Sequence, residues 1–206
     1  MGVVAVEHAE LRRHLAGVPG WLSDEEAVAL YELAKDCTGR GVIVEIGSFK
    51  GRSTICLGLG SQAGRGVPVY AVDPGHGWKR FAEFDANIRR AGIERLVTPV
   101  AAASGDAYSG FTEPAIELLF IDGSHRYDLV DLDFHLWTRK LIDGGMLAMH
   151  DTSAFFPGSC RVAYSFRLRL NLRNSNSHSL ASRQSWEKGT LERPSFSTHT
   201  GPAHSA

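Results

Sequence analysis

Short apolar runs that alternate with helical patterns are the feature that most constrains the fold of this chain. Five runs have the length and composition of buried strands, at residues 42–46, 67–72, 96–100, 116–121 and 146–149. Parallel strands need a crossover connection, and helices supply it when the two patterns alternate. The sequence therefore predicts an α/β fold with a doubly wound, mostly parallel sheet.

A capping box marks one helix ahead of the first apolar run. Ser23 is followed three residues later by Glu26, so that the hydroxyl and the carboxylate satisfy N–H groups at the helix start. We expect this helix to run to about Lys35, because turn residues follow at 38–41.

Two further connections carry apolar stripes at helical spacing. The predicted core residues are Phe81, Phe84, Ile88 and Ala91 in the first, and Tyr127, Val130, Phe134, Trp137 and Leu141 in the second. The second connection also contains three aspartates, Asp128, Asp131 and Asp133. Acidic residues are favoured near the start of a helix, so we expect these three to face solvent.

Composition indicates one α/β domain followed by a segment of different character. A chain of 206 residues, 43% hydrophobic, suffices for one such domain but not for two of ordinary size. Residues 160–206 contain no aspartate, nine serines, and seven Lys and Arg against two Glu. We therefore expect a core at 1–159 and an atypical, poorly ordered tail at 160–206, in which residues 162–172 alternate as one strand could.

The charge balance argues against nucleic acids and membranes as partners, because proteins attract both through a strong positive potential. With 22 basic and 23 acidic residues, the chain lacks the basic field expected for a nucleic-acid or membrane partner. Three widely spaced cysteines favour a reducing compartment, and charged residues interrupt residues 1–18 where a signal peptide needs its apolar run. We expect a cytoplasmic protein that acts on a small-molecule substrate, and a homo-oligomer is compatible with this sequence.

The first apolar run ends in a glycine turn that suits a cofactor. Gly47 and Gly51 permit a tight turn and a close approach of the ligand to the backbone. Phe49 stands where the dinucleotide fingerprint G-x-G-x-x-G has its second glycine, which disfavours an NAD-dependent oxidoreductase. A cofactor with an amino-acid end would instead place its carboxylate on N–H groups of the turn, near Glu45.

A carboxylate, Asp73, ends the second apolar run, 26 residues after Gly47. An acid at this place can accept both hydroxyl groups of a ribose. Alternatively, it is a turn residue before Pro74 and Gly75.

Four segments together resemble a known family. They are E-I-G-S-F-K-G-R-S, A-V-D-P, L-L-F-I-D-G-S-H-R-Y and D-G-G-M-L-A-M-H-D-T, in this order along the chain. Over about residues 20–158 the chain resembles class I S-adenosylmethionine-dependent methyltransferases, most closely methyltransferase family 24, which is similar to catechol- and caffeoyl-CoA-type O-methyltransferases. The resemblance implies a Rossmann-like fold, S-adenosylmethionine as cofactor, and methylation of a hydroxyl group on a phenol, a sugar or a secondary metabolite.

The resemblance also assigns cofactor contacts to particular residues. In the family the glycine turn holds the methionine part and the acid after the second strand holds the ribose. The matching residues are Glu45, Gly47, Ser48, Gly51 and Asp73. Ser104 or Asp106, after the third strand, would lie near the adenine.

Two aspartates, Asp122 and Asp151, follow the fourth and fifth apolar runs. The carboxyl edge of such a sheet is where ligands bind, and two carboxylates there favour Mg²⁺ or another divalent cation. Strand-end aspartates can also merely cap the following turn. Related cation-dependent enzymes take ligands from the positions of Asp122, His150 and Asp151, but His150 stands where the family usually has an oxygen ligand, and imidazole better suits Zn²⁺ or another transition metal.

His125 follows Asp122 by three residues, at the place where the catechol- and caffeoyl-CoA-type enzymes carry a catalytic lysine. Imidazole can accept a substrate proton near neutral pH, so His125, with Asp122, is the predicted catalytic pair. The acceptor oxygen would then attack the methyl carbon of the sulfonium in line. A hydrogen bond at a helix start is the structural alternative for His125.

The tail leaves one competing hypothesis. Methyltransferases of this type continue after the fifth strand with a helix and two more strands, a pattern that residues 161–177 do not supply. A truncated or frame-altered relic of the family would bind the cofactor without catalysing the reaction, and the lost strands would leave an exposed apolar sheet edge.

Overall fold

Six strands form one sheet in the order β3-β2-β1-β4-β5-β6. In the computed structural model, residues 2–75, 78–113, 115–152, 155, 157–162 and 180–183 are described. The strands are β1 (Val42–Ile46), β2 (Val69–Val72), β3 (Val97–Val100), β4 (Ile116–Ile121), β5 (Leu141–Met149) and β6 (Leu180–Arg183). Strands β1 to β5 are parallel and β6 is antiparallel to β5, which confirms the predicted α/β fold with a mostly parallel, doubly wound sheet.

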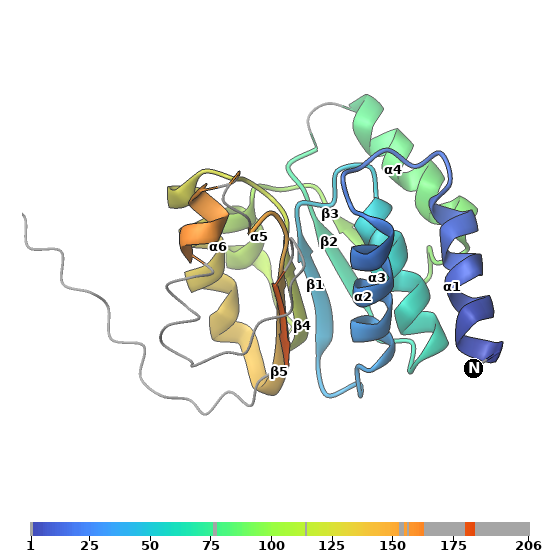
Figure 1. The fold of residues 1–206 in the computed structure, drawn as a ribbon. Coiled ribbons are helices and arrows are strands. Elements are labelled where there is room, and N and C mark those ends of the chain that lie inside the picture. The colour runs from blue at the N-terminus through green and yellow to red at the C-terminus, as the bar shows by residue number, and fades with distance from the viewer. Residues whose placement is uncertain are drawn as a thin grey trace, which may run out of the picture.

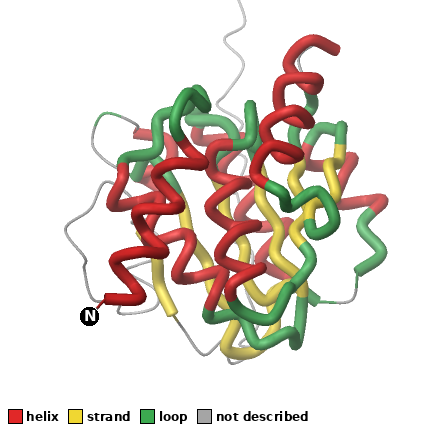
Figure 2. The backbone as a smooth tube through the Cα atoms, turned by 90° about the vertical axis from the view of Figure 1, so that its right-hand side faces the viewer, coloured by secondary structure: helices red, strands yellow, loops and turns green. Residues whose placement is uncertain are grey.

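Helices cover both faces of this sheet (Figure 1). One face carries α1 (Gly2–Leu15), α2 (Asp24–Lys35), α3 (Arg52–Ala63) and α4 (Trp78–Ala91). The other carries α5 (Ser104–Gly110), α6 (Tyr127–Trp137) and a helix at 157–162, and the short 3₁₀ turn η1 (Thr138–Lys140) leads from α6 into β5. Figure 2 views the molecule from the side of α1 to α4, with the strands behind these helices.

Each face of the sheet has its own apolar core. The first core joins the sheet to helices α1 to α4, through side chains such as Leu15, Leu30, Ile55, Phe84 and Leu118. The second joins the sheet to α5, α6 and the helix at 157–162, through Val44, Ala107, Phe134, Trp137 and Val162. Consecutive residues of β1 and β4 point to opposite faces and are all buried, as expected for strands covered on both sides.

The capping box and the extent of α2 are confirmed. The Ser23 N–H donates to Glu26 Oε2 at 2.9 Å, and the Glu26 N–H donates to Ser23 Oγ at 3.3 Å. The helix ends at Lys35 as predicted. The sequence patterns did not predict α1, whose Leu11 and Leu15 are nevertheless buried in the first core.

Helix α6 departs from the predicted pattern at three positions. Tyr127 is 40% exposed, because it begins the helix and stacks beneath the guanidinium of Arg161 at 4.5 Å, so its placement in the core was wrong. Leu141 is buried but belongs to β5. Asp133 was expected to face solvent and is only 6% exposed, because it lies on the same helical face as Val130.

The segment after Gly158 contributes to the domain in two places. The helix at 157–162 crosses the predicted boundary at residue 159, and Val162 is a buried helical residue rather than the start of a strand. A Cβ on Gly158 would lie 2.1 Å from the carbonyl oxygen of His125, so this helix packs directly on the loop after β4. Residues 180–183 form β6, which pairs antiparallel with the edge of β5. The remainder of the predicted strand and tail, 163–179 and 184–206, lies outside the described residues.

Within the described ranges, none of the helices combines the length and the apolar character that a membrane crossing requires.

Candidate active site

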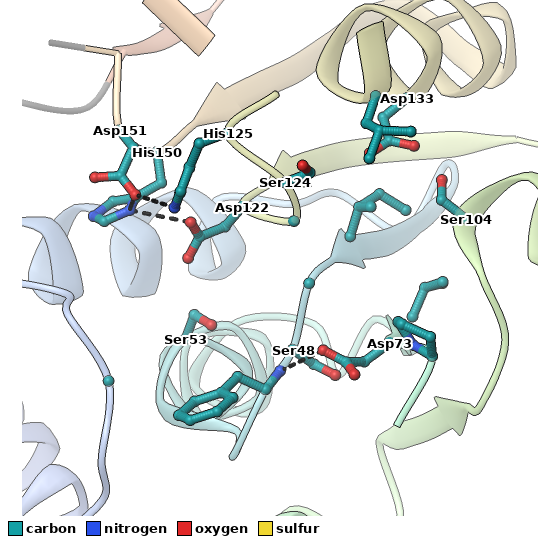
Figure 3. Close-up of a pocket in the computed structure, with 18 of the residues that line it drawn as sticks. Ser48, Ser53, Asp73, Ser104, Asp122, Ser124, His125, Asp133, His150 and Asp151 are labelled. Carbon is teal, nitrogen blue, oxygen red and sulfur yellow. Dashed lines mark hydrogen bonds and ion pairs between the residues drawn. The ribbon is translucent and has the colours of Figure 1, made fainter. Parts of the chain in front are cut away.

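A pocket of about 790 Å³ opens at the carboxyl edge of the sheet. Its walls come from the turn after β1, the ends of β2 and β5, the start of α5, the loop after β4 and the segment 19–22. The volume lies within the range of small-molecule and cofactor sites in proteins. Figure 3 shows the polar side chains that face it.

The glycine turn after β1 forms the floor of this pocket. Gly47 has φ +93°, and a Cβ there would lie 2.3 Å from the carbonyl oxygen of Asp122. Only glycine fits this position, because both the backbone conformation and the space exclude a side chain. The absence of a side chain lets the turn after β1 touch the loop after β4, which brings the predicted cofactor and reaction residues into one pocket.

Several N–H groups of this turn already have partners within the protein. The Gly47 N–H donates to the Val72 carbonyl at 2.8 Å, and the Phe49 N–H donates to Asp73 Oδ2 at 2.9 Å. The Gly51 N–H donates to the Ser48 carbonyl at 2.7 Å. These three N–H groups are therefore engaged within the protein. The first N–H groups of α3 have no partner inside the helix, and this end of the helix reaches the pocket wall.

Asp73 has the turn contact that was one of the two alternatives for it, and its side chain also reaches the pocket. Its Oδ1 accepts the Gly75 N–H at 2.8 Å, as a turn residue does, while Oδ2 accepts the Phe49 N–H. The same carboxylate also lines the pocket. These two backbone bonds fix the carboxylate at the pocket wall.

The predicted cofactor residues divide into two groups. Gly47, Ser48, Asp73 and Ser104 line the pocket, whereas Glu45, Gly51 and Asp106 do not. Glu45 is fully buried beneath α3, where its Oε2 accepts the Thr54 hydroxyl. Burial raises the pKa of Glu45 to about 8, although hydrogen bonds from Ser53 and Thr54 oppose this shift. Glu45 therefore supports the start of α3 from below.

The predicted reaction residues meet at the ends of β4 and β5. His150 Nδ1 lies 3.1 Å from Asp122 Oδ1 and 3.2 Å from Asp151 Oδ2. His125 Nε2 lies 3.4 Å from Asp151 Oδ2, and its side chain is 47% exposed toward the pocket mouth. Figure 3 shows these four side chains converging on one another. Asp151 has φ +52°, a left-handed conformation that aspartate tolerates better than most residues and that recurs at functional sites.

Charge interactions dominate the centre of this cluster. His150 Nδ1 is buried, and it is aligned for a hydrogen bond to neither carboxylate despite the short distances. Burial alone would lower the pKa of His150, but its contacts with Asp122 and Glu26 and the charge of Asp151 raise it to about 10. Burial raises the pKa of Asp122, and the neighbouring His150 opposes that shift.

Three of these side chains have the arrangement of a metal-ligand set. One ligand atom from each of Asp122, His150 and Asp151 lies within 4.8 Å of the others. Two carboxylate oxygens and one imidazole nitrogen can bind a divalent cation. These are the residues for which the sequence predicted a metal site.

Comparison with known proteins identifies the family. A family model described as a methyltransferase domain, that of methyltransferase family 24, matches residues 44–152, more than half of the chain. The chain belongs to this methyltransferase family. The match confirms the resemblance found in the four sequence segments.

Solved O-methyltransferase structures share the fold of this methyltransferase. The O-methyltransferase from Bacillus cereus, in complex with SAH, is 18% identical, with a TM-score of 0.62 over 81% of this chain and 80% of that one. TomG from Streptomyces achromogenes, in complex with SAM, is 15% identical, with a TM-score of 0.61 over 90% and 91%. The O-methyltransferase NovP is 14% identical, with a TM-score of 0.66 over 86% and 88%. Identities this low establish the common fold only.

A buried acid beside the site of the methyltransferase was not apparent as a site residue from the sequence. Glu26 Oε2, from the start of α2, lies 3.4 Å from His150 Nε2 on the side away from Asp122. This contact lowers the pKa of Glu26 to about 2, against the opposing effect of burial. Glu26 and His150 are far apart in the sequence, and the capping box already explained why a glutamate stands at position 26.

The rim of the pocket is a second feature that sequence reasoning missed. Arg52 binds three carbonyl oxygens at the end of α1 and in the segment after it. Its Nη1 donates to Leu15 and Val18 at 3.0 and 3.1 Å, and its Nε donates to Leu22 at 3.3 Å. These bonds hold the segment over the pocket. Trp21, 82% exposed, packs there against Phe49, with ring centroids 5.5 Å apart and ring planes inclined by 35°.

Proposed function

We propose that this methyltransferase transfers the methyl group of S-adenosylmethionine to a hydroxyl oxygen of a small molecule. The observation that carries the proposal is that one pocket joins the glycine turn and Asp73 to the cluster of Asp122, His125, His150 and Asp151. A donor held at the turn would present its sulfonium methyl toward that cluster. The SAH and SAM complexes of the Bacillus cereus enzyme and TomG support the choice of donor.

The cofactor would span the pocket from the start of α3 to Asp73. The N-terminus of a helix favours a carboxylate, and Ser53 of α3 lies on the pocket wall, which suits the amino-acid end. Asp73 keeps acceptor capacity beyond its two backbone bonds, which suits the ribose hydroxyls.

His125 is proposed as the general base. In the reaction, the acceptor oxygen forms a bond to the methyl carbon while the bond from that carbon to the sulfonium sulfur breaks. The sulfur leaves as a neutral thioether, and the hydroxyl proton passes to the imidazole of His125. The carboxylate of Asp151, 3.4 Å from His125 Nε2, would stabilise the imidazolium that forms.

The ligand set fits a divalent cation. The buried Nδ1 of His150 has no aligned hydrogen bond and lies 3.1 and 3.2 Å from two carboxylate oxygens, so a cation that displaces the imidazole proton would meet one nitrogen and two oxygens. Asp122, His150 and Asp151 would hold the ion, and the imidazole favours a transition metal over Mg²⁺. A bound cation would lower the pKa of the acceptor hydroxyl.

The test is a methyl-transfer assay with radiolabelled S-adenosylmethionine and a panel of phenols and sugars. Reactions would contain EDTA, Mg²⁺, Mn²⁺ or Zn²⁺. We expect labelled product from at least one acceptor, and loss of that product in the variant D122A. Cofactor binding without transfer to any acceptor under any of these conditions would favour the relic hypothesis, and absence of cofactor binding would refute the proposal.

A further inference from the structure

A buried acid at the far end of the pocket has no role in the proposed reaction. Asp133 of α6 is 6% exposed, yet it lines the pocket. Figure 3 shows Asp133 and Ser104 on the side of the pocket opposite His150 and Asp151. A carboxyl group in this position loses solvation, and burial raises its pKa. A buried acid with its side chain at a ligand pocket requires a reason for its presence.

Ser104, at the start of α5, is the polar neighbour of this carboxyl group on the pocket wall (Figure 3). The Trp137 indole N–H donates to Ser104 Oγ at 2.8 Å. An indole nitrogen can only donate, so the Ser104 oxygen is the acceptor and its own hydrogen remains for another partner. Asp133 is the neighbouring acid that this hydroxyl can meet (Figure 3), and a hydrogen bond from Ser104 opposes the rise that burial causes in the pKa of Asp133. The Ser104 hydroxyl is thus placed to donate to Asp133, whose carboxyl group keeps further acceptor capacity on the pocket wall.

Small and apolar residues make up the wall around this acid. Val72 and Pro74 line it at the end of β2, and Ala103 and Gly105 line it at the start of α5. Small and apolar side chains leave room for a flat heterocycle, while one polar group selects its edge. Asp133 is that polar group.

The part of the cofactor that Asp133 would face follows from the proposed function, on which this inference rests. If the sulfonium lies beside Asp122 and the ribose beside Asp73, the base of the cofactor extends beyond the ribose toward the start of α5. We propose that Asp133, oriented by Ser104, accepts a hydrogen bond from the exocyclic amine of the adenine and so selects adenine over other purines. A carboxyl oxygen can accept this bond whether or not the group is ionised.

Three ligands that differ at one position of the base test this directly. They are S-adenosylhomocysteine, its purine analogue with hydrogen in place of the amine, and its inosine analogue with a carbonyl. Because the facing group is an acceptor, we expect affinity to decrease in that order, with roughly tenfold or more lost on removal of the amine. Titration calorimetry on the full chain measures the three dissociation constants.

The variant D133N tests whether Asp133 causes the preference for the ligand that carries the amine. Its amide can turn an N–H group toward the carbonyl of the inosine analogue, so we expect the preference for the amine to fall at least tenfold. The matched control is D131N, on the same helix, whose native carboxylate pairs with His135 outside the pocket. The control should keep the wild-type order and ratios.

Two results would overturn the inference while leaving the proposed function intact. One is equal affinity of the wild type for all three ligands, and the other is an unchanged ratio in folded D133N. If D133N does not fold, S104A is the second variant, since it frees the carboxyl group and should weaken the same preference; an unchanged ratio there contradicts the inference equally. Failure of the wild type to bind S-adenosylhomocysteine at all would refute the proposed function, and the inference with it.

Discussion

Glu26 Oε2 lies 3.4 Å from His150 Nε2, and both side chains are more than nine-tenths buried. The same carboxylate oxygen accepts the Ser23 N–H at 2.9 Å, so the N-terminus of α2 is joined to the end of β5. A histidine that binds a metal through one ring nitrogen commonly donates the other N–H to a carboxylate, which fixes the ring and its tautomer. Glu26 is placed to do this for His150.

We predict that E26A weakens cation binding roughly 10- to 100-fold, the usual effect of losing such a partner. Calorimetric titration with Mn²⁺ or Zn²⁺ measures it. The matched control is S23A, which removes the hydroxyl from the same capping box, costs about 1 kcal/mol of stability, and leaves the contact with His150 in place. Equal cation affinity in E26A and S23A would exclude the role of Glu26.

Replacing the proposed base should affect the chemical step alone. We predict that H125A lowers kcat by roughly 10²- to 10⁴-fold, because general-base catalysis contributes that much, and leaves the affinity for S-adenosylhomocysteine unchanged. H135A is the control, since His135 contacts Asp131 on α6 away from the pocket. Unchanged turnover in H125A would remove this residue from the mechanism.

The carboxylate after β2 should matter for cofactor affinity. D73A removes the acceptor of the Phe49 and Gly75 N–H groups together with the proposed ribose contact. We predict at least a tenfold loss of S-adenosylhomocysteine affinity. D85A, an exposed-surface variant on α4, provides the control, and equal affinities of D73A and D85A would contradict the ribose assignment.

The buried acid beneath α3 predicts a pH dependence of stability. The pKa of Glu45 is about 8 in the folded protein, above its ordinary value of 4.5, so the folded protein holds a proton that the unfolded chain releases between these values. The free energy of unfolding should therefore fall by up to about 1.4 kcal/mol per pH unit as pH rises through this window.

The variant E45Q should lack this component of the pH dependence. Urea denaturation of the wild type and E45Q between pH 5 and 8 measures it. The free energy of unfolding of the wild type should fall relative to that of E45Q as pH rises. E25Q, in which an exposed glutamate of α2 is replaced, should follow the wild type. Parallel profiles for the wild type and E45Q would show that Glu45 is ionised in the folded protein.

Much of the fold and the outline of the site could be predicted, because each of these signals is local. The strands are continuous apolar runs, and Asp73, Asp122 and Asp151 each follow one of them. Parallel strands place their carboxyl ends on one edge, so residues that follow different strands meet there without any knowledge of the packing. The capping box of α2 is local in the same sense.

The remainder depends on contacts between distant parts of the chain. Nothing near Glu26 in the sequence indicates His150, and nothing near Arg52 indicates the carbonyl groups that it holds. Glu45 matched a cofactor motif, but α3 covers it. Asp133 carried a usable signal, since it lies three residues after Val130 and four before Trp137 on the buried face, but its charge favoured a position in solvent.

Calorimetric titration of the full chain with S-adenosylmethionine, beside NAD, tests the central claim most directly. Gly47, the start of α3 and Asp73 together predict binding of one S-adenosylmethionine per chain, and Phe49 predicts no binding of NAD. Absence of heat with S-adenosylmethionine, or binding of NAD in its place, would contradict the account of this pocket.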